Sequence, residues 1–214
     1  GPVSYAQLLR RFGHAGAALA ALPDLAARGG AAYKPAPEGR IADEVAAVKR
    51  AGARYLFHDG PDYPALLGQA DSAPPILIAR GDAGFAARPC VAVVGARNGS
   101  INGRQLAEGF GRELATRGYA VVSGLARGID TAAHVGALAA GAAGGGTIAV
   151  MAGGVDHVYP QENEPLYRRI VEQGGAVPGL LEAGGETFAG DFAVVVRAQG
   201  PVPVAAGPDA LQDV

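Results

Sequence analysis

The sequence predicts an α/β fold, a Rossmann-like parallel sheet in a three-layer sandwich, preceded by a small helical domain. The first observation is that short continuous apolar runs alternate with segments of helical periodicity between residues 90 and 173, which is the pattern of βαβ units. The second is that residues 5–30 have apolar side chains at helical spacing and end in two glycines. We therefore place a helical N-terminal domain and linker at 1–37, the Rossmann-like domain at 38–200 and an irregular tail at 201–214.

In the N-terminal domain, residues 5–12 and 15–22 are predicted as two short helices, and Pro23 begins a third. Residues 33–37 contain two prolines and are predicted as a linker. The domain has only three arginines, Arg10, Arg11 and Arg28. These are too few to predict a nucleic-acid contact, and we interpret the domain as a packing appendage.

The next segment is predicted to contain a helix over 40–52 and short strands over 54–57 and 76–78. The turn after the first of these strands holds three potential metal ligands, His58, Asp59 and Asp62. Because no second histidine follows at a ligand spacing, we interpret this cluster as turn chemistry. No metal and no cofactor is predicted.

The central unit is predicted to have strands over 91–94, 119–122 and 147–151, and helices over 104–117, 131–140 and 163–173. Helical crossovers make the strands parallel, so that the loops after them meet at one edge of the sheet. Open α/β sheets bind ligands at this carboxyl edge. A further strand is predicted over 192–196, and its place in the sheet is left open.

These loops favour phosphate binding. Glycine lets a backbone approach a bulky anion, a helix N-terminus offers unpaired N–H donors, and arginine holds phosphate with two hydrogen bonds. The predicted binding residues are Gly95, Arg97, Ser100, Ser123, Gly124, Arg127, Gly128, Gly153 and Gly154. The alternative is that the small residues only form tight turns and that Arg97 and Arg127 are solvated.

Composition limits the function classes. The net charge is −2 and the pI about 6.1, so no overall basic field indicates nucleic acid, yet residues 91–140 hold five arginines against three acids, a local +2. The single cysteine, Cys90, excludes an internal disulfide and a cysteine-based zinc site. We find no membrane span or signal peptide and expect a cytoplasmic protein. Since the only methionine is Met151, we expect the encoded protein to be longer.

Two motifs, VVGARNGS at 93–100 and SGLARGIDTAAH at 123–134, closely resemble the DNA-processing protein A (DprA/Smf) family. Further segments also fit the pattern of this family: APPILIARGD at 73–82, TIAVMAGG at 147–154, the Tyr63–Pro64 pair with Leu66, Asp156, the Tyr159–Pro160 pair and Asn163. The resemblance covers about residues 1–176, and the N-terminal helices resemble the helix-hairpin-helix or SAM-like modules of that family. It implies a protein that binds and protects single-stranded DNA during natural transformation, loads it with RecA recombinase and forms a homodimer, without being an enzyme.

The resemblance breaks after Gly175. The family's FPxRNR segment and SGSLxTA loop are absent, and AVPG at 176–179, which resembles a family turn, comes some dozens of residues too early. We expect a missing stretch near 176–179; the alternative is a real deletion, which would remove about half of the sheet. The tail over 201–214 resembles no winged helix.

The expected mechanism is capture of the DNA backbone by Arg97, Arg127 and the N–H groups of the loops. Since neither of the first two loops contains Tyr or Phe, we expect weak base stacking. The rival function is a nucleotide hydrolase of the lysine-decarboxylase-like (phosphoribohydrolase) family, whose PGGxGTxxE signature is only approached by residues 144–147. A dinucleotide oxidoreductase would need GxGxxG, which residues 95–97 do not provide. Asp130 and His134 share a helix face; we predict that they support the SGLARGID loop and the start of its helix, not catalysis.

Overall fold

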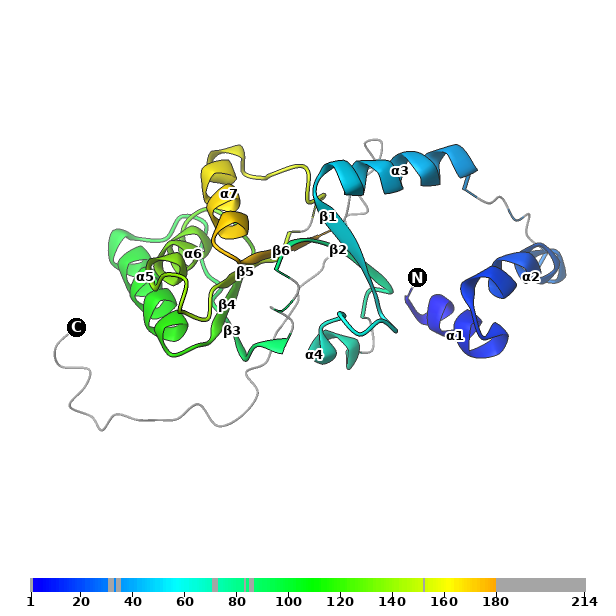
Figure 1. Cartoon of the computed structure of the whole chain (residues 1–214), viewed down its shortest axis with the longest axis horizontal. Coiled ribbons are helices and arrows are strands. Elements are labelled where there is room, and N and C mark those ends of the chain that lie inside the picture. Colours follow the sequence, from blue (N-terminus) through cyan, green and yellow to red (C-terminus); the bar gives the residue numbers. More distant parts are fainter. Residues whose placement is uncertain are drawn as a thin grey trace.

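The computed structural model in Figure 1 describes residues 2–30, 33, 36–70, 73–82, 84, 87–151 and 153–179. Its strands form one six-stranded sheet in the order β1-β2-β6-β5-β4-β3. The strands are β1 (Ala53–Phe57), β2 (Ile76–Gly81), β3 (Cys90–Ala92), β4 (Ala120–Ser123), β5 (Thr147–Ala149) and β6 (Ala176–Gly179). The helices are α1 (Pro2–Phe12), α2 (Ala15–Arg28), α3 (Glu38–Arg50), α4 (Ala65–Gly68), α5 (Ile101–Thr116), α6 (Ile129–Ala139) and α7 (Glu164–Glu172). In this described part of the chain no helix is long and apolar enough to span a membrane.

Strands β3 to β6 form the parallel half of the sheet, in which β3, β4 and β5 correspond to the three predicted strands and β6 was not predicted. β3 pairs with β4, β4 with β5 and β5 with β6, all parallel, and α5, α6 and α7 make the three crossovers. Every crossover steps in the same direction across the sheet. Because such connections are right-handed, all three helices lie on one face. The antiparallel strands β2 and β1 extend this half, with β2 pairing beside β6.

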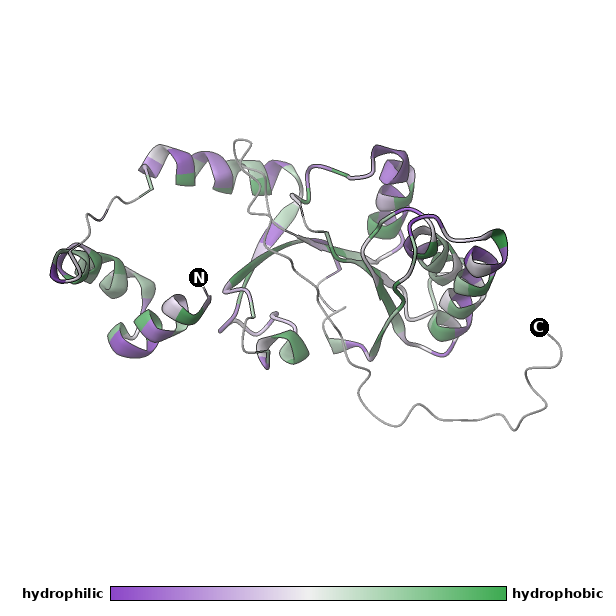
Figure 2. Ribbon diagram, turned by 180° about the vertical axis from the view of Figure 1, so that it is seen from behind, coloured by the Kyte–Doolittle hydropathy of each residue, from purple (hydrophilic) through white to green (hydrophobic). Residues whose placement is uncertain are grey.

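The helix-covered face holds the larger part of the core. α5 and α6 cross with their backbones in contact, since a Cβ at Gly111 would lie 2.3 Å from the Ala133 carbonyl oxygen and one at Gly136 would lie 2.0 Å from that of Glu108. Leu138 of α6 and Ile170 of α7 pack with apolar residues of β5 and β6. Figure 2 shows that the strands of the sheet are predominantly hydrophobic.

The opposite face is covered, within the described residues, by the short α4 and the segment that precedes it. Tyr63 and Leu67 pack there against Leu56 of β1 and Ala79 of β2, in a cluster that includes Val122 of β4. The mixed α/β fold, Rossmann-like in its parallel half, is therefore confirmed. Its three layers are unequal, because only one face carries long helices.

The N-terminal domain is a hairpin of α1 and α2 (Figure 1). The predicted third helix is wrong, because α2 continues through Pro23 to Arg28. A proline within a helix leaves the carbonyl four residues earlier, here that of Leu19, without its N–H partner. Leu19 is 56% exposed, so water can satisfy this carbonyl. Ala18 is the one buried residue of the two helices.

The junction after α7 also differs from expectation. Gly174 has φ +76°, and the chain enters β6 directly, between β5 and β2. Residues 176–179, predicted as a turn from the AVPG resemblance, are thus a strand at the centre of the sheet. A missing stretch near this junction stays a prediction. The predicted strand over 192–196 and the tail over 201–214 lie outside the described residues.

Candidate functional site

The first two loops at the carboxyl edge, residues 93–100 and 124–128, pack directly against each other. The Ser123 hydroxyl donates to the Val93 carbonyl (2.7 Å), and the Ile129 N–H donates to the Ala96 carbonyl (3.3 Å). Gly128 has φ +78°, and a Cβ there would lie 2.3 Å from the Ala96 carbonyl oxygen. Glycine is therefore required at Gly128 by backbone conformation and by contact between the loops. Gly95 contributes in the same way, because a Cβ there would meet the Ile129 side chain at 2.7 Å.

The second loop is organised around a buried carboxylate. Asp130 is 5% exposed, and its Oδ2 accepts from the N–H groups of Gly124 (3.1 Å) and Ala126 (3.4 Å). The N–H of Gly124, predicted as a phosphate donor, is thus held by an anion of the chain itself. The predicted support of this loop by Asp130 is confirmed.

Asn163 ties the third loop to the second, a role that the sequence reasoning did not assign. Its Nδ2 donates to the Leu125 carbonyl (2.8 Å) and to the Thr131 hydroxyl (2.9 Å). Thr131 in turn donates to the Ala126 carbonyl (2.7 Å). Leu125 adopts φ +57° and is fully buried. The only signal in the sequence was the place of Asn163 in the motif that follows Asp156.

The two predicted arginines differ in their surroundings. Arg97 is exposed and makes no hydrogen bond or ion pair to a described residue. Arg127 is also exposed but pairs with Glu162 through two hydrogen bonds, Nε to Oε1 and Nη2 to Oε2 (2.7 Å). The hydrogen bond from Arg127 lowers the pKa of Glu162, and Glu162 raises the pKa of Arg127. In the free protein, therefore, a carboxylate occupies the position that a phosphate would take on Arg127.

The remaining predicted residues are placed as follows. Ser100 is exposed and is the N-cap of α5, where its hydroxyl accepts from the Gly103 N–H (3.1 Å). Ser123 is 3% exposed, so its hydroxyl serves the contact between the loops. Gly153 and Gly154 follow β5 at the same edge, and the Gly154 carbonyl accepts from the His157 N–H (3.0 Å) in a turn. All nine predicted residues thus lie at one edge, and their contacts with DNA stay predictions.

His134 lies away from the loop surface, in the interface between α6 and the sheet. It is fully buried, and its Nδ1 lies 2.7 Å from the Thr147 hydroxyl. Because Thr147 donates its one proton to the Val121 carbonyl (2.7 Å), the proton between the two side chains belongs to Nδ1. The buried Nε2 has no partner, and burial lowers the pKa of His134 to about 4. These contacts support a structural role between α6 and β5, so the prediction that His134 supports the SGLARGID loop is wrong.

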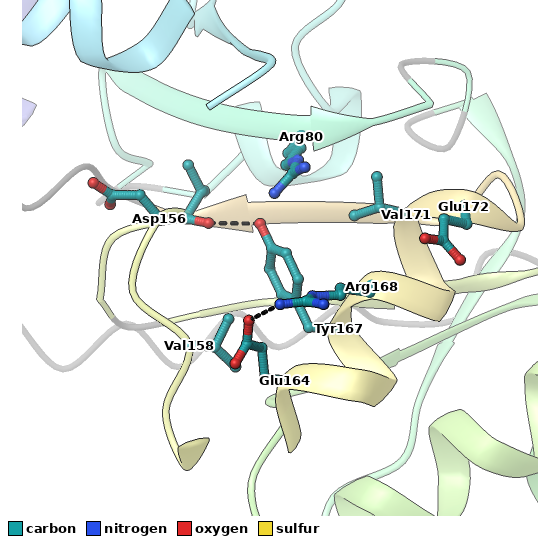
Figure 3. A pocket seen from close by; sticks show the side chains of 9 residues that line it. Arg80, Asp156, Val158, Glu164, Tyr167, Arg168, Val171 and Glu172 are labelled. Atoms are coloured by element: carbon teal, nitrogen blue, oxygen red, sulfur yellow. Dashed lines mark hydrogen bonds and ion pairs between the residues drawn. The ribbon is translucent and has the colours of Figure 1, made fainter. Parts of the chain in front are cut away.

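A cavity of about 360 Å³ lies between β2, α7 and the loop 155–158, shown in Figure 3. It is lined by two arginines, three acids and four other residues: Arg80, Val155, Asp156, Val158, Glu164, Tyr167, Arg168, Val171 and Glu172. Arg80 lies over the Tyr167 ring at 5.6 Å, and the Tyr167 hydroxyl donates to the Val155 carbonyl. The net negative lining does not favour phosphate. Among the described residues, no three His, Cys, Asp or Glu side chains are placed so that together they could hold a metal ion.

Residues 54–186 match the model of the DNA recombination-mediator protein A family, and residues 1–47 match that of the DprA-like N-terminal HHH domain. The chain is 43% identical over 108 residues to the DNA processing protein DprA of Streptococcus pneumoniae, covering 49% of this chain and 36% of that protein. It is 34% identical over 123 residues to the DprA of Bacillus subtilis, covering 57% of this chain and 40% of that protein. The chain thus spans well under half the length of these curated relatives.

Two solved structures of DNA processing protein A resemble the fold of this chain. DNA processing protein A from Streptococcus pneumoniae superposes with a TM-score of 0.53 at 32% identity, over 69% of this chain and 50% of that one. A Helicobacter pylori DNA processing protein A, described for its unique single-stranded DNA binding mode, gives a TM-score of 0.50 at 26% identity, over 60% of this chain and 56% of that one. With a family match over more than half of its residues, a matching N-terminal domain and a shared fold, this chain belongs to the DNA recombination-mediator protein A family.

Proposed function

We propose that this protein is a cytoplasmic DNA-processing protein that binds incoming single-stranded DNA during natural transformation, at the carboxyl edge of β3, β4 and β5. Loading of RecA and a homodimeric state belong to the same proposal and rest on the family resemblance alone. The observation that carries the DNA-binding part is the exposed Arg97, without a partner among the described residues, beside the N-terminus of α5. The single-stranded DNA binding described for the Helicobacter pylori protein supports the choice of ligand.

The mechanism of binding follows from the state of each group at the edge. Arg97 is available to a phosphate at once, and the N–H groups of Gly95 to Gly99 have no partner among the described residues. Arg127 exchanges Glu162 for a phosphate, and exposed ion pairs of this kind are weak. The Gly124 and Ala126 N–H groups remain on Asp130. Phosphates are therefore held at the outer rim of the loops, and few are neutralised.

The experiment is fluorescence anisotropy of a labelled thymidine oligomer with the parent and with Arg97→Ala. We expect the variant to bind roughly ten- to a hundredfold more weakly, because a charged hydrogen-bond donor to phosphate is lost. Arg117→Ala is the matched control. Arg117 is equally exposed but pairs with Glu113 at the far end of α5, and its loss should leave affinity unchanged. Equal affinity of Arg97→Ala and the parent would refute the placement of the DNA.

The nucleotide hydrolase is not favoured by the position of its nearest signature. Residues 144–146 precede β5, which Thr147 begins, and the Gly145 N–H donates to the Ala115 carbonyl at 2.7 Å. The Gly145 carbonyl accepts from Arg88. These contacts hold the segment at the amino end of the parallel strands, the end opposite to the three loops. We accordingly propose a binding protein that does not cleave nucleotides.

A further inference from the structure

We propose that Tyr159, in the third loop, is a stacking platform for a DNA base next to the phosphate held by Arg127. This inference rests on the proposed binding of single-stranded DNA and adds the group that contacts the bases. The first observation is the exposure of the ring. Tyr159 is 71% exposed, whereas Tyr63 and Tyr167 are 7% and 2% exposed. The hydroxyls of these two buried tyrosines donate to backbone carbonyls. Packing of the fold does not account for the ring of Tyr159.

The second observation is position. Tyr159 lies in the loop after β5, at the edge where the three loops meet, and three residues before Glu162. Glu162 holds Arg127 by two hydrogen bonds. Glu162 therefore joins the loop that carries Tyr159 to Arg127, so that a guanidinium for phosphate and an exposed ring for a base belong to the same rim of the loops.

The third observation is the rigidity of the frame that carries the ring. Pro160 is buried, and its carbonyl accepts from the Asn163 N–H at 2.9 Å. Asn163 is itself buried and fixed to the Leu125 carbonyl of the second loop. The backbone beside Tyr159 is thus held before DNA binds, so stacking costs little ordering of the loop.

The chemistry of such a platform matches the proposed ligand. Base–aromatic stacking tolerates any base, because every base has a π face, and it is a main source of affinity in single-strand binding proteins. We expected weak base stacking because the first two loops contain no aromatic residue. The fold brings Tyr159 to the same edge from the third loop, and this supplies the missing ring.

The test compares two ligands of equal length and phosphate count, a thymidine oligomer and an abasic oligomer, by anisotropy at one salt concentration. We expect Tyr159→Ala to weaken binding of the thymidine oligomer roughly five- to a hundredfold, the range for loss of one stacked base. Tyr159→Phe should bind like the parent, and Tyr159→Leu should show most of the loss of the alanine variant. On the abasic oligomer all four proteins should bind alike.

Phe110→Ala is the matched control, because Phe110 is also an exposed ring, 54% exposed, but lies on α5 away from the loops; it should bind both oligomers like the parent. Unchanged thymidine affinity in Tyr159→Ala would overturn the inference while leaving the proposed function intact. An equal loss on both oligomers would also overturn it, because the ring would then act on the backbone or the fold. A parent that binds neither oligomer would overturn the proposed function itself, and the inference with it.

Discussion

The buried His134 makes the stability of the fold depend on pH in a defined window. Burial lowers its pKa from 6.5 to about 4, because protonation would place a charge in the core and an unpaired N–H donor at Nε2, where the described structure offers no acceptor. The folded pKa lies below the unfolded one, so the unfolded chain binds more protons between pH 4 and 6.5. Stability from this group is complete above about pH 6.5 and falls as the pH is lowered to 4, by about 3 kcal/mol over the window.

The assay is urea denaturation of the parent and of His134→Leu at several pH values from 4 to 7.5. Carboxylates also titrate below pH 5, so the quantity to compare is the difference in unfolding free energy between the two proteins. We expect that difference to shift by about 3 kcal/mol in favour of the variant as the pH falls through the window. His157→Gln, at an exposed histidine, is the control and should follow the parent. A constant difference between parent and His134→Leu would refute the neutral buried imidazole.

Two further predictions concern the loop edge. Glu162→Gln should bind a thymidine oligomer about two- to fivefold more tightly at low salt, because Arg127 is released from its carboxylate partner. Anisotropy measures the change, and Glu113→Gln, which frees Arg117 elsewhere on the surface, should leave affinity unaltered. The gain should vanish in the Arg127→Ala background, and a gain that persists there would mean that Glu162 acts only through its charge. Prolonged incubation with nucleoside monophosphates and oligonucleotides should release neither base nor shortened strands by chromatography. Turnover that is lost in Asp130→Asn while DNA binding is retained would instead establish an enzyme.

Three strands of the parallel half, β3, β4 and β5, were predictable because they are short continuous apolar runs. Buried on both faces, such strands leave a signal that does not depend on their neighbours. β6 gives the opposite case. Its Ala176–Gly179 segment contains a proline and a terminal glycine, and only pairing with β5 and β2 makes it a strand. The prediction that a new helix begins at Pro23 is wrong for a related reason. An exposed helix such as α2 tolerates a proline, because water can satisfy the carbonyl that loses its N–H partner.

The three loops meet at one edge of the sheet, as predicted, because chain order and the handedness of crossovers place them there regardless of side chains. The partners of its residues were not predictable. Arg127 and Glu162 are 35 positions apart, and Asn163 and Leu125 are 38 apart. Both contacts depend on how the loop after β5 folds back over the second loop. Periodicity and spacing carry no information on such a contact.

The two carboxylates at the edge have different consequences for an incoming anion. Asp130 is buried and accepts from two N–H groups. If a phosphate took over these donors, the Asp130 carboxylate would stay buried without hydrogen-bond partners, which is costly. Glu162 is exposed on an equally exposed Arg127, and on leaving it is solvated at once. We therefore expect a phosphate to displace Glu162 but not Asp130. In the proposed mode of binding, this order brings the DNA backbone to Arg97 and Arg127 at the outer rim, where Tyr159 is the ring that a base would meet.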